Sequence, residues 1–411
     1  MLIQNLIIIM KNITKSKLIG IVITSSLFSG CGGGTGDGGN AFQLFSPLPN
    51  NIATPINNPS TTEKNTLGQL LFWDPILSGN QDVACATCHH PAKGYADALI
   101  LSQGVGGMGL GEDRIGGSLA KRNAPTILNT AFNGIHNQGP HVPEQAPMFW
   151  DNRIRSLEHQ AKLPILSQEE MRGEDIAEDQ IMAIVIERLE AIPEYKQLFL
   201  NAFGTSVITE TLIFKAIASF ERSLIANNSR FDQFLKGDSN ALTAIEQEGL
   251  EEFVEVGCAE CHSGPMLSDY QLHVIGTPDL TLPNGTLLTD MGAGQLDFRT
   301  PTLRNLNLTG PYMHNGIFET LEEVVQFYQQ ASQGENIHPS LSLQDLAPQI
   351  QQLDMGDGDG DGDGDGDGDG DGDGEGGNNA IVSFLKSLQD DQFDKTIPES
   401  VPSGLQPGGN I

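Results

Sequence analysis

The chain has 411 residues, 38% of them hydrophobic, so it is long enough for two or three domains and apolar enough to bury real cores. Its formal net charge is −31, from 22 basic and 53 acidic residues. Because phosphate binding needs clustered lysine and arginine, this charge argues against nucleic acid as a partner, whereas a basic protein partner is compatible with it.

The N-terminus has the pattern of an export signal. Three lysines between positions 11 and 17 precede the apolar run "LIGIVITSSLFSG", which is too short to span a membrane as a mature helix. The string "LFSGC" resembles a bacterial lipobox, so we expect 1–30 to be a lipoprotein signal peptide and Cys31 to be lipidated. An ordinary signal peptide cut nearby is the alternative. Either way we expect a periplasmic or cell-envelope protein, attached to the membrane only through this lipid, with 31–66 as a flexible tether.

The pattern beyond the tether predicts a mainly α fold. Apolar residues recur at helical spacing in five segments, which are 180–192, 211–226, 241–256, 320–331 and 378–389. A boundary near "KGDSNALT" divides the chain into a domain over 67–238, a second over 239–395, and a tail over 396–411. The second domain contains an Asp-Gly repeat, within 356–377. Its aspartates are potential calcium ligands, but the position that an EF-hand loop fills with Glu is Gly here. We therefore expect this low-complexity insert to be solvated and disordered.

The cysteine count is accounted for without a disulfide. One of the five is Cys31, and the others form two Cys-x-x-Cys-His motifs, "CATCH" and "CAECH". This motif is the attachment signature of c-type haem, because each thiol adds to a haem vinyl group and the adjacent histidine meets the iron from the same side. A four-cysteine zinc site does not explain the two histidines, and a thioredoxin-like redox pair fits neither the histidine nor the helical context. The predicted haem-binding residues are Cys85, Cys88, His89, Cys258, Cys261 and His262.

Three longer strings resemble one known family. They are Arg122–Asn133 ("RNAPTILNTAFN"), Met148–Met171 ("MFWDNRIRSLEHQAKLPILSQEEM") and Arg299–Tyr328 ("RTPTLRNLNLTGPYMHNGIFETLEEVVQFY"). With both haem motifs in order, the chain resembles the bacterial di-haem cytochrome c peroxidase family, and in one respect its MauG-like branch. The resemblance implies two cytochrome c-like α domains, each with one covalent haem c, at a shared interface that also holds a calcium ion. It also implies hydrogen peroxide as substrate, a cytochrome c or cupredoxin as electron donor, and a homodimeric state that is common in the family.

The resemblance implies catalytic roles for three residues spaced ten apart. The N-terminal haem, with His89 as proximal ligand, is the peroxidatic one. Trp150 matches a tryptophan between the haems, and Gln160 matches a distal hydrogen-bonding amide. Glu170 matches the distal acid, which moves a proton from the near to the far oxygen of peroxide. Taken without the resemblance, Glu170 is more simply a surface charge and Trp150 a core aromatic, which is the reading we prefer for Trp73.

The resemblance also implies residues around the second haem. Asn123 matches a side-chain calcium ligand, and Thr309 and Pro311 match backbone carbonyl ligands, the oxygen donors that calcium prefers. His314 matches a histidine near the second haem, with a supporting role and no bond to iron.

Two departures from the family pattern carry information. Many members have a loop histidine that blocks the peroxidatic iron at rest, but the loop here, 95–121, has no histidine. Met108 is the only residue of this loop that could replace it as an iron ligand, and a methionine in a glycine-rich loop is a poor candidate. We therefore expect that iron to be open. Standard members place a Met ligand fourteen residues after the position of His314, where this chain has Tyr328, as MauG-type members do. Phenolate stabilises oxidised iron, whereas Met raises the potential. The alternative is that Tyr328 only packs and Met313 or another Met binds the iron.

Three functions stay open at this stage. The leading one is a di-haem peroxidase that takes electrons from a small redox protein. The second is a MauG-like oxidase that modifies a protein substrate, and the third is a non-catalytic di-haem electron carrier.

Overall fold

The computed structural model describes residues 44–136, 140–356 and 376–411. The predicted signal peptide, the lipidated Cys31 and the Asp-Gly repeat lie outside the described residues. Within these ranges, every helix is too short or too polar to cross a membrane.

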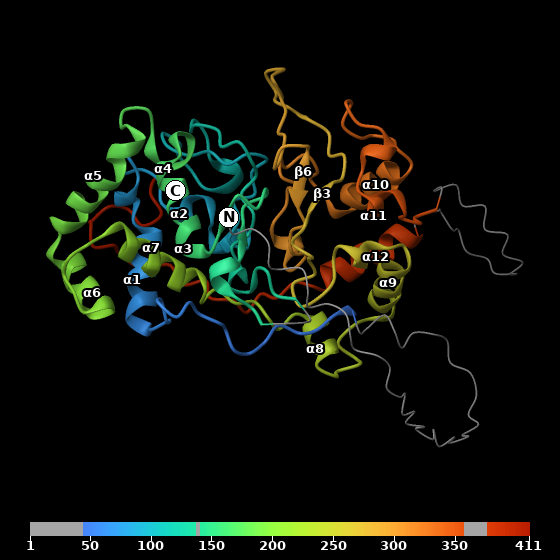
Figure 1. The fold of residues 1–411 in the computed structure, drawn as a ribbon, viewed down its shortest axis with the longest axis horizontal. Helices are drawn as coiled ribbons and strands as arrows, with labels where there is room; N and C mark the ends of the chain where they lie inside the picture. Colours follow the sequence, from blue (N-terminus) through green and yellow to red (C-terminus); the bar gives the residue numbers. More distant parts are fainter. Residues whose placement is uncertain (1–43, 137–139, 357–375) are drawn as a thin grey trace, which may run out of the picture. The chain divides into compact units, whose positions relative to one another are not determined.

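Helices dominate the first half of the chain. The long ones are α1 (Thr62–Trp73), α5 (Glu178–Glu190), α6 (Pro193–Phe203) and α7 (Glu210–Glu221), and α2 (Cys85–Cys88), α3 (Leu157–Gln160) and α4 (Leu163–Leu166) are single turns. Helices α1 and α7 pack closely (Figure 1), since a Cβ at Gly68 would lie 2.0 Å from the Ala216 carbonyl oxygen. This pair forms one wall of the core that supports the first haem motif.

The second half repeats this arrangement with its own helix pair. Its helices are α8 (Arg230–Leu235), α9 (Ala244–Glu255), α10 (Leu321–Ser332), α11 (Pro348–Gln351) and α12 (Gly376–Lys386). Helix α9 packs against α12, where a Cβ at Gly249 would lie 1.9 Å from the Ala380 carbonyl oxygen. The Phe253 and Phe384 rings, 5.3 Å apart, fill the core beside them. Both haem motifs therefore lie next to a close helix pair, and α12 packs back on the second half as the sequence predicts.

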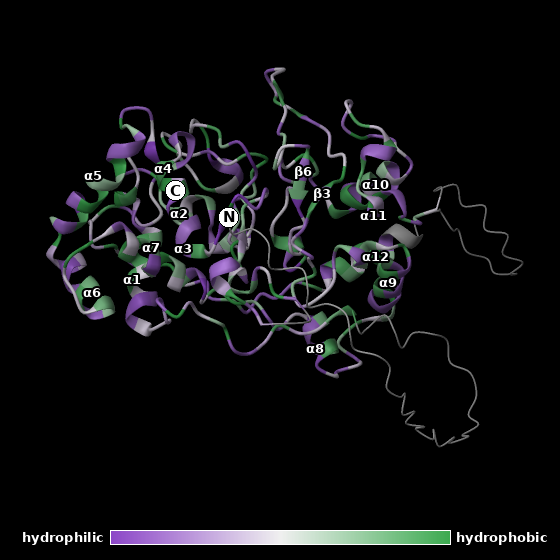
Figure 2. Ribbon diagram, in the orientation of Figure 1, coloured by the Kyte–Doolittle hydropathy of each residue, from purple (hydrophilic) through white to green (hydrophobic). Residues whose placement is uncertain are grey.

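Strands are short and occur as three antiparallel pairs. Strand β1 (Pro147–Met148) pairs with β2 (Ile154–Arg155), β3 (Leu272–Val274) with β6 (Asp297–Arg299), and β4 (Leu280–Thr281) with β5 (Leu287–Leu288). The five helical segments predicted from periodicity correspond to α5, α7, α9, α10 and α12. Figure 2 shows α5, α6 and α10 banded in green and purple, as amphipathic helices with one buried face are.

Both ends of the described chain contact the rest of the protein. Phe45 is buried against Phe231 with ring centroids 5.5 Å apart, and Leu48 is buried as well, so this part of the predicted tether is packed against the protein. The C-terminal segment runs back to the first half (Figure 1), where the Gly408 amide donates to the Trp73 carbonyl at 2.7 Å. The Thr87 hydroxyl, inside the first haem motif, donates to the Gly408 carbonyl at 2.7 Å. Apolar side chains within 44–66 and long-range hydrogen bonds at the C-terminus thus hold both ends in place.

Candidate active site

Both Cys-x-x-Cys-His motifs open on one cavity. Its volume is about 1060 Å³, at the upper end of the roughly 1,000 Å³ reached by small-molecule and cofactor pockets. It is lined mostly by apolar surface with a few polar groups, as cofactor sites are. The motif residues on its wall are Cys85, Cys88, His89, Cys258, Cys261 and His262.

The two motif histidines are oriented in the same way. His89 Nδ1 lies 3.0 Å from the Tyr95 carbonyl oxygen, and His262 Nδ1 lies 2.9 Å from the Leu267 carbonyl oxygen. A carbonyl oxygen only accepts hydrogen bonds, so Nδ1 carries the proton and Nε2 keeps its lone pair. Burial lowers the pKa of both imidazoles, which keeps them neutral. This is the arrangement in which an imidazole binds a metal, so both residues fit an axial haem ligand.

The four motif cysteines are free thiols, and they do not gather into a zinc site. Burial raises the pKa of Cys85 and of Cys258 to about 12. Zinc is bound by thiolates, which these buried environments disfavour. Among the described residues, one group of three potential metal ligands lies within 4.8 Å, and it contains Cys261 alone of the four. The structure therefore favours separate haem attachment at each motif over a shared four-cysteine site.

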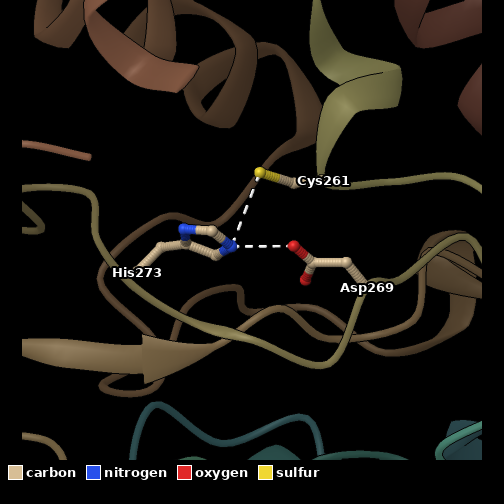
Figure 3. A group of neighbouring side chains, drawn as sticks. All are labelled: Cys261, Asp269 and His273. Carbon is tan, nitrogen blue, oxygen red and sulfur yellow. Dashed lines mark hydrogen bonds and ion pairs between the residues drawn. The ribbon is translucent and has the colours of Figure 1, made fainter. Parts of the chain in front are cut away.

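That group consists of Cys261, Asp269 and His273 (Figure 3). His273 Nε2 lies 2.8 Å from Asp269 Oδ2 and 3.7 Å from Cys261 Sγ. The hydrogen bond that His273 donates to the Asp269 carboxylate raises the pKa of His273 to about 10, so the imidazolium is paired with the carboxylate. A sulfur that forms a thioether to haem is no longer a thiolate ligand, so the predicted haem attachment at Cys261 would leave this group with only two potential metal ligands.

The three predicted catalytic residues all line the same cavity. Trp150 follows strand β1, Gln160 ends helix α3, and Glu170 lies in a π-helical turn over Gln168–Arg172. The Trp150 indole Nε1 donates to the Asn123 carbonyl at 3.0 Å, which fixes the ring. Three different segments of the chain therefore contribute these side chains to the same cavity.

The Glu170 carboxyl is in a mixed environment. Burial raises its pKa above the usual range, and the negative Glu169 adds to this. The positive charges of Arg153 and Lys121 and a hydrogen bond with Ser167 act in the opposite direction. A carboxyl with a raised pKa that faces a cofactor cavity is suited to proton transfer, and it is not the exposed surface charge of the simpler interpretation.

The loop over 95–121 places neither a histidine nor a methionine in the cavity. Its cavity-lining residues are Leu101, Ser102, Ala120 and Lys121. The loop folds around Arg114, which is 1% exposed and donates to the Gln103, Gly104 and Gly109 carbonyls. Met108 pairs across this hairpin with Ile115 and is 65% exposed. Met108 therefore points away from the site that a blocking ligand would occupy.

The residues predicted to hold calcium come from two segments in contact. The Asn123 amide N–H donates to the His314 carbonyl at 2.8 Å, which joins Asn123 to the 309–314 loop. Asn123 Nδ2 donates to the Leu99 carbonyl at 2.8 Å, which leaves Oδ1 as its remaining polar atom. Asn123, Thr309 and Pro311 all line the cavity. The predicted ligand atoms, a side-chain amide oxygen and two backbone carbonyls, are of the type that calcium prefers.

The second motif faces an aromatic side chain. Tyr328, on helix α10, lines the cavity, and burial raises its pKa, with the Cys261 and Cys258 thiols adding to the shift. Met313 and Met355 line the cavity as well, so the alternative of a methionine ligand also has candidates. The His314 ring stacks on Phe298 at 3.6 Å, and burial lowers its pKa to about 4, which makes it a neutral, packed residue.

Sequence reasoning missed the charged residues beside the predicted ones. Arg122 bonds Asp290 through Nε and Nη2 and Asp151 through Nη1 at 2.8 Å, linking the neighbours of Asn123 and Trp150 to the β4–β5 hairpin. Glu221 lines the cavity, and burial raises its pKa to about 8. Arg122 and Asp151 are adjacent in sequence to Asn123 and Trp150, which is the one signal that could have found them. Glu221 and Asp290 lie far along the chain from the predicted residues, so local patterns do not reveal them.

Comparison with known proteins identifies the family. The family model for di-haem cytochrome c peroxidase matches residues 62–240. Methylamine utilization protein MauG from Methylophilus methylotrophus is 34% identical over 321 residues, covering 75% of this chain and 87% of that protein. The chain belongs to the di-haem cytochrome c peroxidase family.

Other relatives in this family agree with that placement. Cytochrome c551 peroxidase from Pseudomonas aeruginosa is 32% identical over 310 residues, covering 73% of this chain and 81% of that protein. The crystal structure of a MauG-like protein associated with microbial copper homeostasis matches with a TM-score of 0.65 and 26% identity, covering 84% of this chain and 95% of that chain. The chain is therefore an oxidoreductase of the cytochrome c peroxidase type, from a family with both peroxidase and MauG-like members.

Proposed function

We propose that the chain reduces hydrogen peroxide at the first motif, with electrons that enter from a small redox protein through the second motif. One observation carries this proposal. Both motifs open on one cavity together with Glu170, Gln160 and Trp150, while the 95–121 loop places no histidine or methionine in the cavity to block the first motif.

The cavity residues divide the work of the reaction. The cysteines and the histidine of each motif would hold one haem, and these haems would supply the redox-active iron needed for peroxide reduction and electron storage. Glu170 accepts the proton of the near peroxide oxygen and returns it to the far oxygen, so that the far oxygen leaves as water. The Gln160 amide donates a hydrogen bond that orients peroxide beside Glu170. Two electrons and two protons taken up in total convert each peroxide into two waters.

Trp150 provides the route between the two halves. Its indole is held by the Asn123 carbonyl and its backbone carbonyl accepts from the Arg299 amide at 2.6 Å, so both halves fix its position. An indole held in this way is suited to passing an electron between two redox centres that do not touch. The His262 and Tyr328 side serves as the electron-relay centre, and Asn123, Thr309 and Pro311 hold calcium at the junction.

Tyr328 supports a second candidate, a MauG-like oxidase that takes electrons from a side chain of a protein substrate. Phenolate ligation would stabilise oxidised iron, which suits storage of oxidising equivalents better than acceptance of electrons from a donor. The proposals of export, lipid attachment at Cys31 and a periplasmic location apply to either function.

Steady-state turnover of the purified di-haem protein with hydrogen peroxide and reduced cytochrome c or cupredoxin separates the candidates. The peroxidase predicts donor oxidation that depends on peroxide, with two donors oxidised per peroxide. Slow donor oxidation, together with peroxide-dependent modification of tyrosine or tryptophan in a co-purified protein, would instead support the oxidase. An electron carrier would show neither activity.

A further inference from the structure

Arg299 is a buried cation that bonds no carboxylate among the described residues, although its guanidinium lies over the Tyr270 ring, 5.8 Å from the ring centroid. It lies in strand β6, is 8% exposed, and lines the cavity. Its Nε donates to the Phe149 carbonyl at 2.9 Å, and this is the one side-chain hydrogen bond it makes with the described part of the chain. A guanidinium has five N–H donors, so the four on Nη1 and Nη2 lack protein acceptors.

Such an arrangement is costly unless another group completes it. A buried charge is normally paired or fully hydrogen-bonded, because its desolvation is otherwise not compensated. Arg114 shows how the protein alone can satisfy such a group, since each of its three side-chain nitrogens donates to a backbone carbonyl of its own loop or of the C-terminus. Burial lowers the pKa of Arg299, as expected of a cation without a close carboxylate.

The other arginines and the lysine on the cavity wall differ from Arg299. Arg122 is bonded to Asp151 at 2.8 Å and to Asp290. Arg153 bonds the same Asp151 and its side chain is 45% exposed, and Lys121 is exposed. Asp151 is the carboxylate whose charge acts on Arg299, but it is already bonded to two other arginines. Arg299 is therefore the cavity-lining arginine, among the described residues, that has no carboxylate.

Strand β6 places Arg299 on the side of the second motif. Arg299 pairs with Leu272 of β3, in the segment that follows the second motif. The Asp269 amide in this segment donates to the Cys261 carbonyl at 2.8 Å, and the Ser268 hydroxyl donates to the Thr300 carbonyl at 2.7 Å. The wall that carries Arg299 is thus continuous with the wall that carries the second haem motif.

We propose that Arg299 binds a propionate of the haem attached at Cys258 and Cys261. The proposal rests on the two-haem content of the proposed function. The planar fork of a guanidinium matches a carboxylate in two parallel hydrogen bonds, and the cavity side of Arg299 offers donors in that geometry. The same residue holds the Phe149 and Trp150 carbonyls, so the propionate contact fixes the second haem relative to the Trp150 segment.

The test compares Arg299→Gln, Arg299→Lys and Arg188→Gln in the haem-loaded protein. Arg188 is a matched control, because it also donates only to backbone carbonyls, those of Ile76, Ser78 and Gly79, but it does not line the cavity. Haem content is measured first, and then the reduction potential of each haem between pH 5.5 and 9.

The charge argument fixes the sign of the result. Without Arg299 the propionate negative charge is uncompensated and favours ferric iron, so Arg299→Gln lowers the potential of the second haem. The propionate also binds a proton more readily, so this potential rises as the pH falls. Arg299→Lys keeps most of the wild-type potential, and Arg188→Gln leaves both potentials unchanged.

Three outcomes would overturn the proposal. Wild-type potentials with unchanged pH dependence in a fully haem-loaded Arg299→Gln protein would refute the propionate contact. A shift in potential confined to the first haem would refute the assignment of this contact to the second haem. If Arg299→Gln protein does not accumulate, Arg299→Lys tests the contact instead. This substitution changes the group that bonds the propionate, so it should shift the propionate bending band in resonance Raman spectra, and an unshifted band would contradict the contact. A wild-type protein that carries fewer than two haems would refute the proposed function itself.

Discussion

Replacing the Glu170 carboxyl tests the proposed proton transfer. Glu170→Gln keeps the size of the side chain and its place in the Gln168–Arg172 turn, but removes the group that accepts and returns a proton. General acid–base catalysis contributes about 10²- to 10⁴-fold. We expect a loss of about 10³-fold in kcat/KM for hydrogen peroxide, which corresponds to ~4 kcal/mol at 1.36 kcal/mol per decade.

The pH dependence of the same reaction supplies an independent check. The carboxylate form accepts the peroxide proton, and burial raises the pKa of Glu170, so wild-type kcat/KM rises with pH through that raised pKa. Glu170→Gln should lose this rise as well as the rate. Rapid mixing of the oxidised enzyme with hydrogen peroxide measures both.

Glu174→Gln is the control for this experiment. This substitution also removes one carboxylate, four residues further along the chain, but Glu174 is exposed and does not line the cavity. Its variant should keep wild-type rates and pH dependence. A Glu170→Gln enzyme that reacts as fast as wild type, or one that retains the pH profile, would refute the role of Glu170 in moving the proton.

Three further predictions follow from the second haem side and from the core. Tyr328→Met should convert one haem spectrum to a His/Met type with a higher potential, and an unchanged spectrum would mean that Tyr328 only packs. Asn123→Ala should lose calcium and turnover at a lower chelator concentration than wild type, and an equal chelator response would contradict the calcium assignment. Asp232→Asn leaves the buried Arg304, bonded to Asp232 at 2.9 and 3.0 Å, without its counter-charge, so urea unfolding should show a loss of about 3–5 kcal/mol. A loss below about 1 kcal/mol, the value typical of surface pairs, would contradict this account of the pair.

Sequence patterns predicted the parts of the molecule that depend on local order. The five periodic segments form helices because each has one apolar face, and Trp73 is fully buried as expected of a core aromatic. The predicted site residues from Cys85 to Tyr328 all line one cavity. They come from the two haem motifs and from the three segments that resemble the family.

The features that local patterns did not predict arise from contacts between distant segments. The packing of Phe45 on Phe231 and the return of Gly408 to Trp73 join residues that lie more than a hundred positions apart. The lack of a bonded carboxylate for Arg299 is likewise a property of the whole cavity wall, so the residues next to it in the sequence could not predict it.

The electron paramagnetic resonance spectrum of the resting, oxidised di-haem enzyme tests the central claim most directly. An open site opposite His89 predicts a high-spin ferric signal, together with a separate low-spin signal from the haem at His262, and the high-spin signal should disappear when hydrogen peroxide is added. Two low-spin signals that do not respond to peroxide would show that both irons are blocked, and would contradict catalysis at the first motif.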